Sequence, residues 1–196
     1  MSDYSKFIAP ERRSVPTPKH MVENGKCVFG TFDKEFETMD LMSIKNPTHA
    51  PDCFKKLKLT IWEATEVHLD EGVLLAVVCD MGIFGQTMNI FYDKRKKKVY
   101  TWASKVPSKD AIVADNLING SETKCDAKGV SIHYVNNFQD GKCSLKGWQE
   151  DAPGRIEYDF NLTRISKPCV VSIPFDCASR KRAEFKFAYL KGAIWQ

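Results

Sequence analysis

The segment of residues 155–163, RIEYDFNLT, alternates between apolar and polar residues more regularly than any other part of the chain. Its apolar or aromatic positions are Ile156, Tyr158, Phe160 and Leu162. Side chains of a β-strand point alternately to opposite faces, so a period of two residues predicts a strand with one buried and one solvated face. The segment therefore predicts an antiparallel sheet that covers a core on one side.

The same period recurs toward the N-terminus. Residues 57–69, LKLTIWEATEVHL, alternate, whereas residues 73–79, VLLAVVC, are apolar throughout and predict a central strand covered on both faces. Residues 87–93 and 98–103 predict a hairpin whose tip carries the basic run KRKKK at 94–98. About eight such strands, at spacings typical of antiparallel meanders, predict a mainly β chain.

The β pattern occupies residues 25–175, and the chain differs on both sides of it. Residues 1–24 contain three prolines, which exclude a continuous helix or a central strand, so we expect an extended or disordered arm. Residues 176–196 form a divergent basic segment, for which both a strand and a short helix are open. We therefore expect one antiparallel β domain with a Pro-rich N-terminal arm and a basic C-terminal segment.

Composition narrows the class of protein. The chain has 196 residues, of which 43% are hydrophobic and 28% charged, as in soluble globular proteins. A net charge of +4 is too small to mark a nucleic-acid binder, and no apolar run is long enough for a membrane span. The seven cysteines form no C-x-x-C pair and the N-terminus lacks a hydrophobic signal core, so we expect free thiols and a cytoplasmic protein.

The sequence contains one candidate catalytic acid and none of the common catalytic motifs. The motifs G-x-S-x-G, H-E-x-x-H and G-x-G-x-x-G and the P-loop are absent, and the histidines lack metal-ligand spacing, so we expect neither metal nor cofactor. Asp80 follows the apolar run directly, and a buried carboxylate is costly unless it is paired. It is either a general acid in a cavity or a strand-end residue that caps the bend at residues 81–82.

Sustained antiparallel alternation also predicts a curled sheet or barrel, because curling removes exposed strand edges. Barrels of about eight strands are either filled by side chains or hold one small ligand. The candidate ligand-binding residues are aromatic: Trp62, Phe91, Tyr134 and Tyr158. The alternative is that these aromatic side chains are simply core.

Five short segments follow one another along the chain: Trp62-Glu63, residues 80–85 (DMGIFG), residues 91–93 (FYD), Asn136-Asn137 and residues 172–175 (SIPF). Together they resemble the uncharacterised domain-of-unknown-function 2804 family, over residues 25–175 and without a catalytic motif. That family is more remotely similar to the lipocalin-like group of carotenoid hydratases and tocopherol cyclases. The resemblance implies a lipocalin-like (calycin) β-barrel or curled half-barrel. It also implies that the chain matches only the N-terminal half of the family pattern.

Three functions follow as hypotheses. The first is a protein that binds a hydrophobic small molecule, a lipid or isoprenoid, in a barrel cavity. The second is a cofactor-free cyclase, isomerase or hydratase that uses Asp80 as its acid, with Glu63 or His68 nearby. The third is a truncated, inactive or interaction-only family member. We expect a small-molecule partner rather than nucleic acid, and the oligomeric state stays open.

Overall fold

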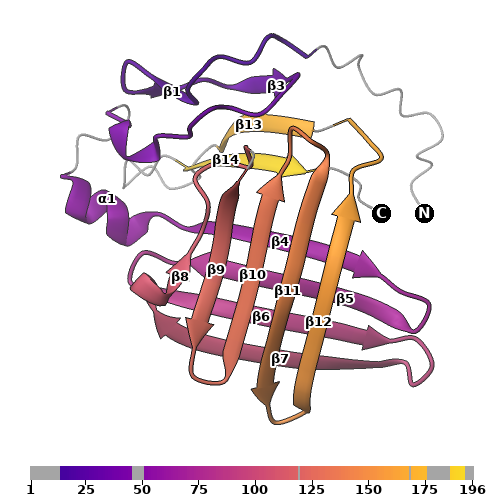
Figure 1. Cartoon of the computed structure of the whole chain (residues 1–196). Helices are drawn as coiled ribbons and strands as arrows, with labels where there is room; N and C mark the ends of the chain where they lie inside the picture. Colours follow the sequence, from indigo (N-terminus) through magenta and orange to yellow (C-terminus); the bar gives the residue numbers. More distant parts are fainter. Residues whose placement is uncertain (1–13, 46–50, 119, 168, 176–185, 193–196) are drawn as a thin grey trace, which may run out of the picture.

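The computed structural model describes residues 14–45, 51–118, 120–167, 169–175 and 186–192. Antiparallel β-structure dominates these residues (Figure 1). All pairings between the named strands are antiparallel, which confirms the prediction of a mainly β, antiparallel chain. In this part of the chain, no helix is both long enough and apolar enough to span a bilayer.

The first large sheet is a four-stranded meander. Its strands lie in sequence order: β4 (Ile61–His68), β5 (Gly72–Asp80), β6 (Phe84–Asp93) and β7 (Lys98–Pro107). The predicted hairpin is β6–β7, with most of the basic run in its turn. The central strand β5 buries its inner face, but Val73 and Leu75 on its outer face are only half-buried. Val77 on the outer face is buried, so the prediction that β5 is covered on both faces holds for the inner face and in part for the outer face.

The second large sheet has five strands in the order β12-β11-β10-β9-β8. They are β8 (Ala111–Ile112), β9 (Ser121–Ala127), β10 (Val130–Asn137), β11 (Lys142–Asp151) and β12 (Gly154–Thr163). The regular segment 155–163 lies within the edge strand β12 and points Tyr158 inward. The alternating pattern is thus confirmed as a strand with one face toward the core.

These two sheets pack face to face, and the strands of one run across those of the other (Figure 1). Their inner faces form one core, made of Leu74, Ala76, Val78, Val106, Ala111, Cys125, Val130, Ile132, Tyr134, Leu145 and Tyr158. Burying a large apolar side chain contributes about 1.5–3 kcal/mol, so this core carries much of the stability. Glycine at position 85 allows the close packing, because a Cβ there would lie 2.3 Å from the Cβ of Ala111.

The strand orders are those of open sheets, so within the described residues no barrel closes. β7 ends at Pro107, which has no N–H to continue a ladder. The chain then turns through the short 3-10 helix η3 (Ser108–Asp110) into β8, which pairs with β9 instead of β7. Of the two predicted forms, a barrel or a curled half-barrel, the closed barrel is absent from this part of the chain, which forms two packed sheets.

A smaller unit contains the described parts of both flanking segments, residues 14–24 and 186–192. Its sheet, in the order β14-β13-β3, joins β3 (Gly30–Phe32), β13 (Cys169–Phe175) and β14 (Lys186–Gly192), and β1 (Val22–Glu23) forms a hairpin with β2 (Lys26–Cys27). In the predicted arm, Met21 is fully buried, while residues 1–13 lie outside the described residues. In the C-terminal segment, residues 186–192 are a strand paired with β13, not a helix.

The helix α1 (Asp52–Lys58) and the 3-10 helix η2 (Leu41–Ser43) lie at one end of the four-stranded sheet (Figure 1). α1 packs against the turn between β5 and β6. There, Gly82 has a φ of +78°, and a Cβ on it would lie 2.2 Å from the carbonyl oxygen of Lys56. Only glycine suits this position, because both its backbone angle and its contact exclude a side chain.

Candidate functional site

A chain of buried polar side chains crosses the interior between the two large sheets. The Asn89 Nδ2 of β6 donates to Gln149 Oε1 of β11 at 2.8 Å, and Gln149 Nε2 donates to Ser104 Oγ of β7 at 2.9 Å. The hydroxyl of Tyr158 on β12 donates to Asn89 Oδ1 at 2.8 Å. We call these four residues the inter-sheet network. Asn89 and Gln149 are both 0% exposed, so their amides depend on one another for hydrogen bonds.

A glycine on β11 leaves the space that the Tyr158 ring needs to reach the network. Gly147 of β11 lies opposite Tyr158 in the pairing of β11 with β12. A Cβ at Gly147 would lie 2.8 Å from the Tyr158 hydroxyl oxygen and 2.9 Å from its ring. The missing side chain therefore leaves the space in which the phenol passes β11 and reaches Asn89 on the opposite sheet.

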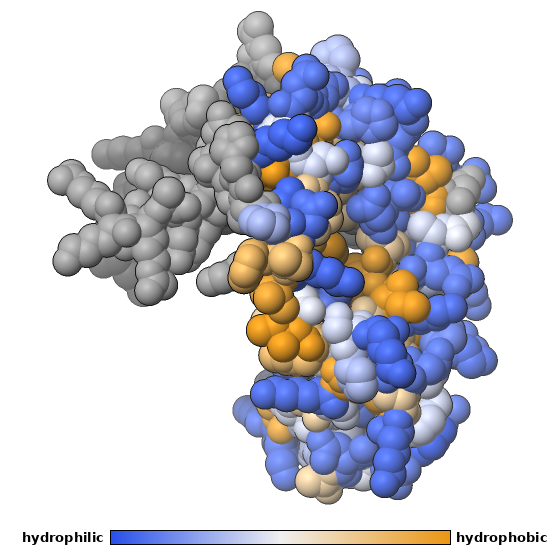
Figure 2. Space-filling model, turned by 90° about the vertical axis from the view of Figure 1, so that its left-hand side faces the viewer, coloured by the Kyte–Doolittle hydropathy of each residue, from blue (hydrophilic) through white to orange (hydrophobic). Residues whose placement is uncertain are grey.

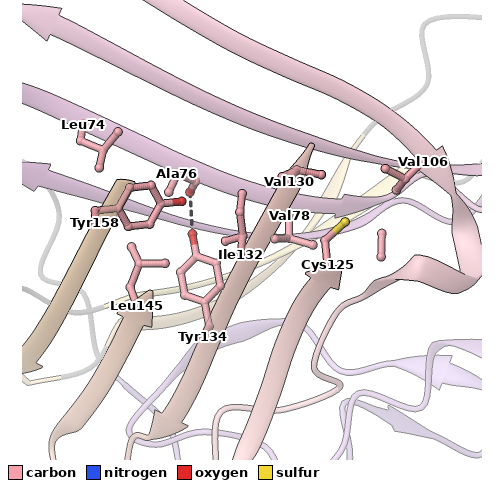
Figure 3. Close-up of a cluster of buried hydrophobic side chains, with 11 residues drawn as sticks. Leu74, Ala76, Val78, Val106, Cys125, Val130, Ile132, Tyr134, Leu145 and Tyr158 are labelled. Carbon is pink, nitrogen blue, oxygen red and sulfur yellow. Dashed lines mark hydrogen bonds between the residues drawn. The ribbon is translucent and has the colours of Figure 1, made fainter. Parts of the chain in front are cut away.

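A second tyrosine also links the sheets. The hydroxyl of Tyr134, on β10, donates to the carbonyl oxygen of Ala76 on β5 at 2.6 Å (Figure 3). Burial raises the pKa of Tyr134 well above its ordinary value, and the charge of Glu63 adds to this effect. The same two causes raise the pKa of the Cys143 thiol to about 12. These two groups are thus held neutral.

The hydroxyl of Thr87 stands out beside the network. Thr87 is fully buried and pairs in register with Ser104, one of the network residues. Its Oγ1 has no hydrogen-bond partner among the described residues. A buried hydroxyl without a partner costs about 1–3 kcal/mol, so packing alone does not account for this hydroxyl.

Apolar side chains from both sheets pack against the core that contains Tyr158 and are only partly buried. Val67 and Phe91 come from the four-stranded sheet, and Ile156 and Phe160 come from the edge strand β12. The rings of Phe160 and Tyr158 stack with their centroids 5.9 Å apart. The interior is thus apolar and partly accessible at its margin, and it offers hydrogen bonds at its centre.

Three of the four predicted ligand-binding residues belong to this interior. Tyr134 and Tyr158 are buried in the core, and Phe91 packs against it. Trp62, however, is 57% exposed on the outer face of β4. The alternation in β4 is present, but its inward positions are the odd-numbered ones, such as Glu63, so Trp62 lies apart from the other three.

The predicted acid Asp80 lies at the end of β5, away from the network. Its Oδ1 accepts hydrogen bonds from the Gly82 N–H and from the Ser108 hydroxyl, both at 2.8 Å. These contacts hold the β5–β6 turn, as in the alternative interpretation of Asp80 as the cap of this bend. His68 is exposed and pairs with Glu66 rather than with Asp80.

The network residues Ser104, Asn89 and Gln149 were not predicted. A signal was present for Gln149, because the inward positions Cys143, Leu145 and Gly147 extend by two residues to it. The alternation within one strand does not predict its partners, because Asn89 is separated from Gln149 by 60 residues.

The buried tyrosines make stability sensitive to alkaline pH. Burial raises the folded-state pKa of both Tyr134 and Tyr158, whereas the unfolded chain ionises near the ordinary value of 10.0. Their contribution is therefore complete below about pH 10 and declines as the pH rises further, because the unfolded state releases protons first. We expect the urea midpoint to fall from about pH 10 upward, and less steeply in Tyr158→Phe. Equal pH dependence in the two proteins would contradict this assignment.

Among the described residues, no group of three or more His, Cys, Asp or Glu side chains is placed to hold a metal ion. Comparison of the chain with family models, curated proteins and solved structures gave no match.

Proposed function

We propose that the chain binds a small, largely apolar molecule between its two large sheets, in the manner of a lipocalin-like protein. The observation that carries this proposal is the inter-sheet network, set among aromatic side chains and next to the unpartnered Thr87 hydroxyl. Ligand sites are typically apolar with a few placed polar groups that fix orientation. An interior that served packing alone would avoid the cost of buried amides and of an unpaired hydroxyl.

The charges of the interior narrow the ligand class. The inter-sheet network consists of neutral amides and hydroxyls, and no lysine, arginine or histidine belongs to it or to the described core. The charge that raises the pKa values of Tyr134 and Cys143 is the negative one of Glu63. A fatty-acid carboxylate would therefore find no cation in the network or in the described core to balance its charge. We therefore propose an isoprenoid or lipid with a neutral hydroxyl or carbonyl head.

Trp102 is a reporter for this site. It is buried on β7, pairs in register with Asn89, and donates its indole N–H to the carbonyl of Gly154. In a protein that keeps Trp102 and has Phe at positions 62, 148 and 195, we expect saturable emission changes with micromolar geranylgeraniol. Sodium oleate should give much weaker changes, because its head group is anionic. No saturable change, or equal binding of oleate, would contradict the proposal.

Thr87→Val tests the polar end of the site. Valine has nearly the same shape and removes the unpartnered hydroxyl, so the free energy of unfolding should rise, while affinity for geranylgeraniol falls about tenfold, which is about 1.4 kcal/mol. Thr101→Val on the exposed outer face of β7 is the matched control. Equal affinity in both variants would place the ligand elsewhere.

Two further parts of the proposal come from the sequence. A cytoplasmic location is supported by the free state of the six described cysteines.

Membership of the domain-of-unknown-function 2804 family stays a prediction. The acid chemistry considered for Asp80 gains no support from the site, because its carboxylate holds the β5–β6 turn.

A further inference from the structure

Three large apolar side chains project into solvent at the end of the molecule that carries α1. Phe54 and Leu57 of α1 are 61% and 47% exposed, and Ile83 in the β5–β6 turn is 69% exposed. We call these three residues the end patch. Figure 2 shows this end, where apolar surface gathers next to hydrophilic surface. Grouped apolar exposure of this kind is typical of an interaction site, unlike single exposed residues.

The end patch is held in place from several sides. Gly82 brings the β5–β6 turn against the backbone of Lys56 and Leu57, so Ile83 and Leu57 belong to one surface. On the other side of α1, the Lys55 ammonium donates to the carbonyls of Met42 and Ile44 and pairs with Asp52 at 2.8 Å. The helix is thus fixed by polar contacts, and its apolar side chains remain exposed.

Positive charge accompanies the end patch. Lys56 on α1, Lys105 on β7 and Lys109 in η3 are exposed. The Lys105 ammonium lies 5.0 Å from the centre of the Phe84 ring, next to Ile83 in the chain. Lys109 follows Ser108, whose hydroxyl is bonded to Asp80 in the same turn. Two acids at this end are engaged, since Asp52 pairs with Lys55 and Asp80 holds the turn, while Asp110 lies next to Lys109 in η3.

We propose that the end patch docks the protein on a bilayer surface that contains anionic lipid. Phe54, Leu57 and Ile83 would enter the boundary between head groups and acyl chains, and the three lysines would lie at the level of the lipid phosphates. Apolar side chains flanked by lysines are the combination that binds such surfaces. Side chains that project from the surface suit insertion into lipid, whereas an amphipathic helix of a partner protein needs a groove. This proposal does not depend on the ligand proposed above.

Vesicle flotation of the full chain tests the proposal. We expect binding to vesicles of phosphatidylcholine with about one third phosphatidylserine, and little binding to phosphatidylcholine alone. Leu57→Ser with Ile83→Ser should lower the bound fraction at least tenfold, and Lys105→Glu should lower it by a smaller factor. Val99→Ser is the apolar control, because Val99 is 56% exposed at the opposite end of the sheet.

Lys97→Glu in the β6–β7 turn is the charge control, since this turn lies at the opposite end of the sheet from Ile83. Binding that Lys97→Glu weakens as much as Lys105→Glu would overturn the proposal in favour of non-specific attraction to the basic run. Failure of the wild-type protein to float with either vesicle would also overturn it. So would a dimer that Ile83→Ser dissociates, because a second copy would then cover the patch. Unchanged thermal unfolding of each variant would confirm that the fold is intact.

Discussion

Replacing Asn89 by Leu is expected to lower the free energy of unfolding by about 2 to 6 kcal/mol. The two side chains branch at the same atom, but leucine is larger, so overpacking adds to the loss of hydrogen bonds at this buried position. Asn89 donates to Gln149 and accepts from Tyr158, and both partners are buried. Each would be left without its partner, at about 1–3 kcal/mol apiece. Urea unfolding followed by tryptophan fluorescence measures the loss.

A matched control and a double-mutant cycle test the cause of this loss. Asn161→Leu changes an exposed asparagine on β12 and should alter stability by no more than about 0.5 kcal/mol. In a Tyr158→Phe background, Asn89→Leu should lower the free energy of unfolding by less, because the Tyr158 hydroxyl, one of the two groups that would lose a partner, is already absent. Equal costs in both backgrounds would show that the two residues are not coupled.

The second large effect is expected for Gly147→Ala, which should lower stability by about 2 to 4 kcal/mol. The added methyl group would lie 2.8 Å from the Tyr158 hydroxyl oxygen and 2.9 Å from the carbonyl oxygen of Ser131. The phenol ring must therefore move, which removes its hydrogen bond to Asn89 as well. The higher strand propensity of alanine offsets only about 0.5–1 kcal/mol.

A smaller side chain at position 158 provides the test of this explanation. In a Tyr158→Leu background the phenol is absent, so Gly147→Ala should cost clearly less than it does in the wild type. Urea unfolding of the four proteins gives the coupling directly. If Gly147→Ala costs the same in both backgrounds, its effect comes from the backbone contact with Ser131 and not from Tyr158.

The strands were predictable because their signal is local. The alternation in residues 155–163 and the hairpin of residues 87–103 depend on neighbouring residues, and β12 and β6–β7 contain them. The alternation in β4 was also present in the sequence, but it left open which face is inward. The inward face of β4 is the one that packs against the second sheet. On β4, Glu63 therefore faces the interior and Trp62 is exposed.

The elements that sequence reasoning missed depend on distant contacts or on short patterns. The inter-sheet network joins residues 45 to 69 positions apart, which no local period can reveal. Helix α1 has only seven residues and follows Pro51, and it takes in residues 57–58, which the alternating pattern of residues 57–69 assigned to a strand. Its two exposed apolar residues, Phe54 and Leu57, are three positions apart, which was the available signal for a helix. β7 ends at Pro107 and does not pair with β8, so the two sheets do not join there into a barrel.

The central claim is that the interior between the sheets, with Asn89 and Gln149 at its centre, is a ligand site. The most direct test is a titration of isotope-labelled protein with geranylgeraniol, in which the side-chain amide resonances of these two residues are followed by NMR. We predict that both amide signals shift progressively and saturate, together with the indole N–H of Trp102. Amide signals that stay unchanged while resonances of α1 or the β5–β6 turn move would contradict the claim.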